Sequence, residues 1–243
     1  MQITVIGSGD MNSRCMSASY AIDGNILVDL PNGVLREMAR RGTDPLSFSH
    51  VLITHLHGDH VLDLPVFLLE KSKRTEEEKR KVTVYAQREN LPLLRELSVL
   101  SFRTSLTGER TAGILSWNGN DEETIGDCTV TRVPVRHGIL PDCSGYLLQK
   151  DGATVGFTGD TCLTDSVYRM AAVSDILFCD CDLIRGNDSH MGIDDLGRLH
   201  EKFPRCRLVA GHLKDETREE LLRRCPEGIT VAEDGMVFET EAG

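Results

Sequence analysis

The chain has 243 residues, of which 40% are hydrophobic and 27% are charged, and its formal net charge is −11 at pH 7. This composition is ordinary for a globular protein, and the negative charge argues against a general nucleic-acid binder, because phosphate backbones require clustered lysine and arginine. No apolar run approaches the length of a membrane span, no signal-like N-terminus is visible and no Pro/Ser/Gly-rich linker divides the chain. We therefore expect one cytoplasmic domain over residues 1–243, without a membrane partner.

The first half of the chain alternates between predicted strands and predicted helices. The strands are short apolar runs at residues 2–7, 20–22, 26–30, 51–53 and 82–85. The helices carry apolar side chains at helical spacing, over residues 33–41, from about residue 59, and over residues 91–100. The mixed-charge segment 70–81 is interpreted as a solvated connection, with a substrate-facing basic patch as the alternative. The polar segment 105–123 is predicted to be an exposed loop.

The second half repeats this alternation. Its strands are predicted at residues 130–135, 153–158, 175–179 and 207–210. An acidic helix is predicted from Ile193, and residues 229–232 and 236–238 are predicted to form a closing hairpin. Strands separated by helical segments indicate a layered α/β fold, in which functional side chains gather on loops at one rim of the sheet.

The most informative segment is Thr54-His55-Leu56-His57-Gly58-Asp59-His60, directly after the strand at 51–53. His55 and His57 alternate beyond the end of a buried strand, so both imidazoles can turn toward one point. Asp59 and His60 can reach a second point nearby, and Asp59 would lie at the positive end of the following helix. Two clusters of nitrogen and oxygen ligands this close are what a dinuclear metal site needs.

Other ligand-type residues also follow predicted strands. His137, Asp160 and His212 each come two positions beyond one of three of the runs, and His190 lies in an irregular stretch after a fourth. His50 and His200 have no such placement, and we interpret His50 as the first residue of a strand and His200 as part of a helical face.

The eight cysteines are scattered and form no Cys-x-x-Cys pair, which favours buried, reduced thiols over disulfides. Cys162, two residues after Asp160, is the thiol whose position suggests metal proximity or sensitivity to oxidation. Asp29, which follows the strand residues Ile26-Leu27-Val28, could orient a ligand imidazole, and a helix-cap or turn role is an equal alternative.

The ordered set His55-x-His57-x-Asp59-His60, His137, Gly159-Asp160-Thr161 and His212 resembles the metallo-β-lactamase superfamily, over residues 2 to about 239. The resemblance implies an αββα four-layer sandwich with a dinuclear centre at one edge. His55, His57 and His137 would bind the first metal, Asp59, His60 and His212 the second, and Asp160 would bridge them. The antibiotic-hydrolysing members commonly have cysteine at the position of Asp160, so the chain looks unlike a β-lactamase.

Within this superfamily the chain is most similar to the tRNA 3′-processing endonucleases (RNase Z) and related phosphodiesterases. The N-terminal strand with its Gly7-Ser8-Gly9 turn, Phe157-Thr158-Gly159-Asp160-Thr161, and Ser189-His190-Met191 carry this resemblance. It implies that His190, near Asp59, passes a proton to the leaving oxygen, which makes Asp59 and His190 the expected catalytic residues.

Two departures argue against a tRNA substrate. His137 and Asp160 are only 23 positions apart, with no basic arm between them, and Leu213-Lys214-Asp215 replaces the family's Ser-Pro-Arg after the last histidine. A similar arrangement without the arm occurs in the phosphonate-pathway phosphodiesterase that opens cyclic ribose phosphates. That relative also has structural-zinc cysteines near its N-terminus, which the lone Cys15 cannot supply.

The leading hypothesis is a phosphodiesterase that uses hydroxide bound to two divalent ions to attack a small or nucleotide-like phosphodiester. Zinc is the first expectation for the metal, with manganese or iron as alternatives, since the ligand types do not select among them. The alternative function is hydrolysis of a thioester or lactone by the same site, and a third is a non-enzymatic metal-binding module. The sequence leaves the oligomeric state undecided, a homodimer included.

Overall fold

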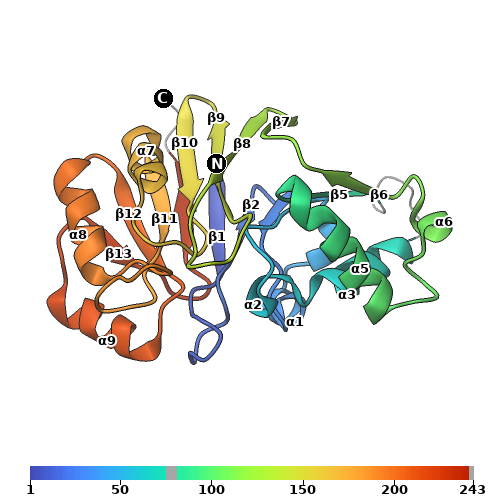
Figure 1. Cartoon of the computed structure of the whole chain (residues 1–243), viewed down its shortest axis with the longest axis horizontal. Coiled ribbons are helices and arrows are strands. Elements are labelled where there is room, and N and C mark those ends of the chain that lie inside the picture. The colour runs from blue at the N-terminus through green and yellow to red at the C-terminus, as the bar shows by residue number, and fades with distance from the viewer. Residues whose placement is uncertain (75–80, 241–243) are drawn as a thin grey trace.

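The computed structural model describes residues 1–74 and 81–240, which form two mixed seven-stranded sheets (Figure 1). The first sheet has the order β14 (Val237–Glu239), β1 (Gln2–Gly7), β2 (Ser19–Ile22), β3 (Ile26–Val28), β4 (His50–Leu52), β5 (Val82–Tyr85), β6 (Leu115–Asn118). The second has the order β13 (Ile229–Val231), β12 (Arg207–Gly211), β11 (Ile176–Asp180), β10 (Ala153–Phe157), β9 (Ser144–Lys150), β8 (Cys128–Pro134), β7 (Glu122–Ile125).

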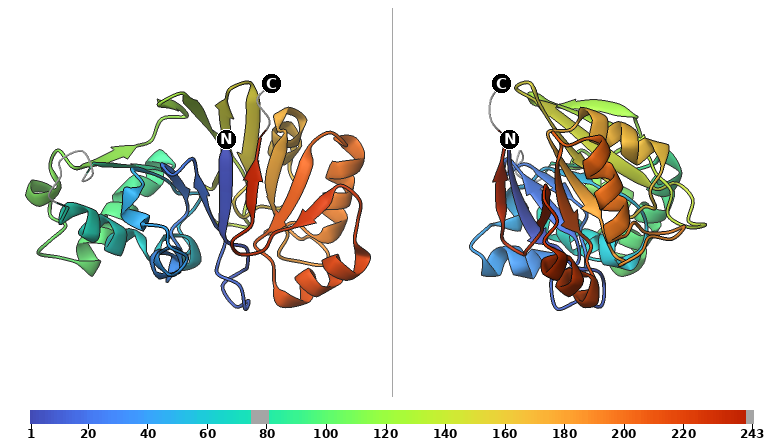
Figure 2. Two further views of the ribbon diagram at one scale, coloured as in Figure 1. Left: turned by 180° about the vertical axis from the view of Figure 1, so that it is seen from behind. Right: turned by 90° about the vertical axis from the view of Figure 1, so that its left-hand side faces the viewer.

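Helices cover the outer face of each sheet, on opposite sides of the molecule (Figures 1 and 2). The first sheet carries α1 (Val34–Arg40), α2 (Gly58–Val61), α3 (Leu64–Ser72) and α5 (Leu91–Ser101), with α6 (Gly108–Thr111) and the 3₁₀ turns η1 (Pro45–Ser47) and η2 (Arg88–Asn90) in its connections. The second sheet carries α7 (Asp165–Val173), α8 (Ile193–Lys202) and α9 (Asp215–Arg224).

Three buried clusters correspond to the three interfaces between these four layers. Alternate residues of a strand point to opposite faces, so Ile3 and Val5 of β1 join the cluster between the sheets, whereas Ile6 joins the cluster under the helices of the first sheet. A cluster under α7, α8 and α9 includes Leu196 and Leu208. Burying each such side chain stabilises the fold by about 1.5–3 kcal/mol. This is the αββα sandwich that the sequence resemblance implied.

The strands that lead into the predicted site end at one rim. In the second sheet β10, β11 and β12 are parallel, and β8 runs the same way because both it and β10 are antiparallel to β9. In the first sheet β3, β4 and β5 are parallel. Beneath the rim, Tyr20, Phe157 and Phe178 pack between the sheets with ring centroids 4.9–5.0 Å apart.

The predicted closing hairpin is wrong. β13 pairs in parallel with β12 in the second sheet, whereas β14 pairs antiparallel with β1 in the first. The turn between them is real, with Gly235 at φ +94°, but it carries the chain from one sheet to the other. Asp234 anchors this crossing by accepting hydrogen bonds from Ser8 and Met16. A turn motif identifies the bend but not the partner of the strand that follows it.

Residues 105–123 are not an exposed loop, because α6, β6 and the start of β7 lie within them. β6 escaped prediction because it is a short edge strand with alternating polar residues, paired only with β5 among the described strands. The helix expected from residue 59 is divided into α2 and α3, and Pro65 lies at the start of α3, where its missing N–H is harmless.

The structure also tests the predictions for the remaining histidines, the cysteines and the mixed-charge segment. His50 begins β4 and His200 lies on α8, as expected. All eight cysteines are free thiols, but Cys225 is exposed, so the prediction that all of them are buried is wrong. Residues 75–80 of the mixed-charge segment lie outside the described residues. Lys71, at the end of α3, is buried rather than solvated. Within residues 1–74 and 81–240, no helix has the length and apolar character of a membrane span.

Candidate metal centre

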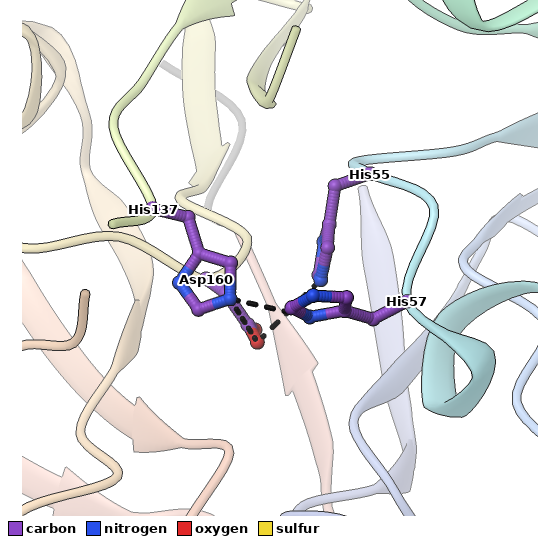
Figure 3. Close-up of side chains that lie close together, drawn as sticks. All are labelled: His55, His57, His137 and Asp160. Atoms are coloured by element: carbon purple, nitrogen blue, oxygen red, sulfur yellow. Dashed lines mark hydrogen bonds and ion pairs between the residues drawn. The ribbon is translucent and has the colours of Figure 1, made fainter. Parts of the chain in front are cut away.

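Seven side chains from the two sheets meet at the common rim. The loop after β4 contributes two of them, the following helix α2 contributes two, and the loops after β8, β10 and β12 contribute one each: His55, His57, Asp59, His60, His137, Asp160 and His212. They fall into potential metal-binding groups whose ligand atoms lie within 4.8 Å of one another. His55, His57, His137 and Asp160 form the first group (Figure 3), and Asp59, His60 and His212 form the second.

Asp160 lies between these groups. Its Oδ1 is 3.4 Å from His60 Nε2, and its Oδ2 is 3.7 Å from His55 Nε2 and 3.3 Å from His212 Nε2. Gly159 precedes it with φ +60°, and a Cβ there would stand 2.8 Å from Thr54 Cβ, so glycine is required for this close approach of the two loops. A carboxylate in this position is placed to contact two ions at once.

Buried polar atoms without a hydrogen-bond partner identify what the site is built to hold. They include one ring nitrogen each of His55 and His60, both ring nitrogens of His212, and Oδ1 of Asp59. An unpaired buried polar atom is costly, and native proteins rarely tolerate several together. Because the orphaned atoms are imidazole nitrogens and a carboxylate oxygen that converge, the donor set fits divalent metal ions.

Asp29 orients the imidazoles from behind. Its Oδ2 lies 2.8 Å from His60 Nδ1, and since a carboxylate only accepts, Nδ1 donates, so that in the neutral ring Nε2 carries the lone pair toward the cluster. The same carboxylate accepts hydrogen bonds from the backbone N–H and the hydroxyl of Thr54. Thr54 Oγ1 in turn lies 3.0 Å from His55 Nδ1. Asp29 therefore has the orienting role that the sequence left as one of two alternatives.

A carbonyl oxygen performs the same task for the third histidine of the first group. His137 Nδ1 donates to the backbone oxygen of Ser189 at 2.9 Å, so its Nε2 faces His57 Nδ1 at 3.2 Å. Figure 3 shows the rings of His137, His55 and His57 directed toward the Asp160 carboxylate.

The pKa values of the clustered side chains are shifted in directions that make protons and metal ions compete for them. Burial, reinforced by the neighbouring imidazoles, holds the pKa of His55 well below its ordinary value. Burial would also lower the pKa of His212, but Asp160 and Asp59 raise that pKa to about 9. Burial would raise the pKa of Asp160, and the surrounding histidines hold it well below its usual range. Metal binding must therefore displace protons from part of the histidine set.

His190 lies beside both groups and is held by Asp180, the last residue of β11. Its Nδ1 donates to Asp180 Oδ2 at 2.9 Å, and its ring lies 4.6 Å from that of His137 and 5.4 Å from that of His212. Burial alone would lower the pKa of His190, but the hydrogen bond and charge of Asp180 raise it above the ordinary value. An imidazole of this kind can carry a proton at neutral pH and release it from Nε2.

An open cleft of about 420 Å³ leads to these side chains. Its lining includes Asp59, Asp160, His190 and His212 of the cluster, together with Asp10, Met11, Asn12, Asp182, Leu183 and Lys214. The volume is in the range of small-ligand sites, so a nucleotide-sized molecule can reach the cluster.

The structure brings together every residue that the sequence nominated for the site. It pairs His190 with Asp180, although His190 shares the cleft with Asp59, beside which it was expected. Asp180 and Ser189 were missed. Asp180 follows directly after the predicted strand 175–179, so the strand-end criterion that selected Asp160 would have found it. The carbonyl of Ser189 has no signal in the sequence.

Comparison with known proteins agrees with this geometry. A model of the beta-lactamase superfamily domain matches residues 24–213, and the chain belongs to the metallo-β-lactamase superfamily. A ribonuclease Z of Streptococcus gordonii is 23% identical over 252 residues, covering 77% of this chain and 79% of that protein.

Two solved structures share the fold over nearly the whole chain. A diphosphatase of the PhnP family superposes with a TM-score of 0.76 and 21% identity, covering 99% of this chain and 98% of that one. The short form of human tRNase Z has a TM-score of 0.74 and 18% identity, covering 98% and 99%. Fold, family and the histidine/aspartate cluster together define a metal-dependent hydrolase.

Proposed function

We propose that this hydrolase is a phosphodiesterase, acting on a small or nucleotide-like phosphodiester, in which His190 protonates the leaving oxygen. The observation that carries the proposal is the His190–Asp180 pair, hydrogen-bonded at 2.9 Å, at the edge of the metal-binding cluster. When a phosphodiester is hydrolysed, one of its alcohols leaves as a basic alkoxide, and this leaving oxygen needs a proton donor. The RNase Z relative is named for the hydrolysis of RNA and the diphosphatase neighbour for the hydrolysis of a diphosphate, so both support a reaction at phosphorus.

The proposed ligands of one ion are His55, His57 and His137, those of the other are Asp59, His60 and His212, and Asp160 contacts both. Zinc is the proposed metal. When bound, two divalent ions lower the pKa of a water toward neutrality and offset the charge that develops on phosphate oxygens.

The remaining steps fall to side chains of the chain itself. Asp29 accepts the Nδ1 proton of His60, so that Nε2 carries the lone pair once the ring is neutral, and Asp180 keeps the His190 imidazole charged and oriented toward the cleft. His190 then gives its Nε2 proton to the leaving oxygen, and the Asp180 carboxylate stabilises the imidazolium beforehand. A tRNA substrate is not part of the proposal, because only β9 and its turns lie between β8 and β10 and no basic arm is present.

The test compares substrates whose leaving groups differ in basicity. p-Nitrophenolate departs without a proton, so His190→Ala should change hydrolysis of bis-p-nitrophenyl phosphate little. A 2′,3′-cyclic nucleotide releases a ribose alkoxide and should lose roughly 10²–10⁴-fold, the usual worth of a positioned general acid. Metal content should stay at two per chain, and His200→Ala, on the outer helix α8, is the matched control.

Two results would contradict the proposal. Equal losses on both esters would assign His190 a positioning role. An unaffected diester rate together with strong turnover of a thioester or lactone would favour the carbonyl-hydrolase alternative that the sequence also allowed.

A further inference from the structure

The wall of the cleft beside His212 carries a lysine that the proposed chemistry does not use. Lys214 precedes α9, lines the cleft, and has a side chain that is 36% exposed. Its Nζ lies 2.7 Å from Asp182 Oδ2, and Asp182 is its only hydrogen-bond partner among the described residues. An ammonium group has three donors, so two of them are free for a molecule in the cleft.

Asp182 holds the lysine in place. Its side chain is 5% exposed, its backbone N–H donates to Asp180 Oδ1 at 3.0 Å, and its carbonyl accepts from Thr217 Oγ1 at 2.8 Å. Its second carboxylate oxygen lies 3.9 Å from His212 Nδ1. The Asp182 carboxylate thus lies between the His212 ring and the Lys214 ammonium, and it holds the lysine side chain in place.

The charge around the cleft makes this position distinctive. Asp10, Asp59, Asp160 and Asp182 line the cleft, and Lys214 is the one lysine or arginine among the described residues that do so. Metal ions would neutralise Asp59 and Asp160, but they would also be occupied by the scissile phosphate. For a second anionic group on the substrate, the other charged side chains that line the cleft are carboxylates or belong to the metal-binding cluster, and Lys214 is the one lysine or arginine that the described lining offers.

We propose that Lys214 forms a subsite for a second phosphate group, so that the preferred substrate is a nucleotide-like diester that carries a further phosphomonoester. The inference rests on the proposed phosphodiesterase function and narrows its substrate class. Met11 and Leu183, which also line the cleft, provide the apolar surface against which the nucleoside between the two phosphates packs. Lys214 is a specificity residue here, with no part in proton transfer.

The experiment uses two substrates with one leaving group: the p-nitrophenyl ester of thymidine 5′-phosphate, with and without a 3′-phosphate. The wild-type protein should favour the 3′-phosphorylated ester by about tenfold in kcat/KM, mainly through KM, as expected for a partly exposed charge-assisted hydrogen bond. Lys214→Met should bring this ratio close to one, and Lys214→Arg should keep most of it. Lys150→Met is the matched control, since Lys150 is likewise a partly exposed lysine paired with aspartate, here Asp23 and Asp127, but lies on β9 and does not line the cleft.

Three outcomes would overturn the subsite: no preference in the wild-type protein, a preference that survives in Lys214→Met, or equal losses on both esters. The last would mean that Lys214 only neutralises Asp182. Calorimetric binding of thymidine 3′,5′-bisphosphate and thymidine 5′-phosphate to the metal-loaded protein separates this inference from the proposed function. If neither ester is hydrolysed, the phosphodiesterase proposal fails, while the difference in affinity between the two nucleotides still decides the role of Lys214.

Discussion

Replacing Asp29 by asparagine should weaken metal binding without disturbing the backbone. Asp29 has φ +57°, a left-handed conformation that asparagine tolerates, so the turn after β3 should survive. The carboxylate accepts from two N–H donors on different groups, Thr54 N at 2.8 Å and His60 Nδ1 at 2.8 Å. An amide has one oxygen and cannot accept from both in the same way.

The backbone N–H of Thr54 can only donate a hydrogen bond, whereas His60 Nδ1 can either donate or accept one, depending on which ring nitrogen carries the proton. In Asp29→Asn the amide oxygen should therefore face Thr54 N and the amide NH₂ should face His60 Nδ1, which pushes the ring proton onto Nε2, the atom needed for metal. Loss of such an orienting partner typically costs 10–100-fold in metal affinity, or about 1.4–2.7 kcal/mol. The loss should be largest for the ion held by Asp59, His60 and His212.

Competition between the protein and a chromophoric zinc chelator measures this directly, with metal stoichiometry followed in parallel. Asp23→Asn is the control, because Asp23 also has a left-handed backbone, at φ +48°, and accepts a backbone N–H, from Gln2, but lies outside the cluster. Asp29→Asn affinities within twofold of the wild-type values at both sites would refute the reasoning.

Two further perturbations follow from buried charged groups. Asp160→Ala should lose at least one ion and several orders of magnitude in hydrolytic rate while keeping its circular dichroism spectrum, because the layers are packed by apolar residues elsewhere; two retained ions with most of the rate would disprove the bridging position. The ammonium of Lys71 donates to the carbonyls of Leu46 and Phe48, and burial lowers its pKa from 10.5 to about 8. Between pH 8 and 10.5 the unfolded chain therefore binds more protons than the folded protein, and the free energy of unfolding should rise with pH. Urea denaturation across this window should show a smaller rise in Lys71→Met than in the wild-type protein, and identical slopes would contradict the assignment.

The candidate metal ligands could be predicted from the sequence because their signal is local. His55 and His57 follow a short apolar strand, and Asp160 and His212 follow two more, so strand ends and ligand-type residues were enough to place them at a common rim. The order of the motifs then identified the superfamily and, through it, the sandwich.

What could not be predicted depends on partners far away in the chain. β13 and β14 are separated by a turn that reads as a hairpin, and only their pairing with β12 and β1 shows that they belong to different sheets. The bond from His137 to the Ser189 carbonyl joins residues 52 positions apart, through a backbone atom that no residue type reveals. Lys214 likewise becomes distinctive only when the charges of the assembled cleft are known.

The distribution of the proposed ligands over both sheets has a consequence for how long the protein survives in a cell. Each ion would be held by side chains after β4 on one side and after β8, β10 or β12 on the other, so it would cross-link the two halves of the sandwich. A ligand that binds only the folded state, at a thousand times its dissociation constant, adds about 4 kcal/mol to the free energy of unfolding. Zinc shortage would then act on the amount of protein as well as on its activity, because chains without metal would unfold more often and be removed by proteases.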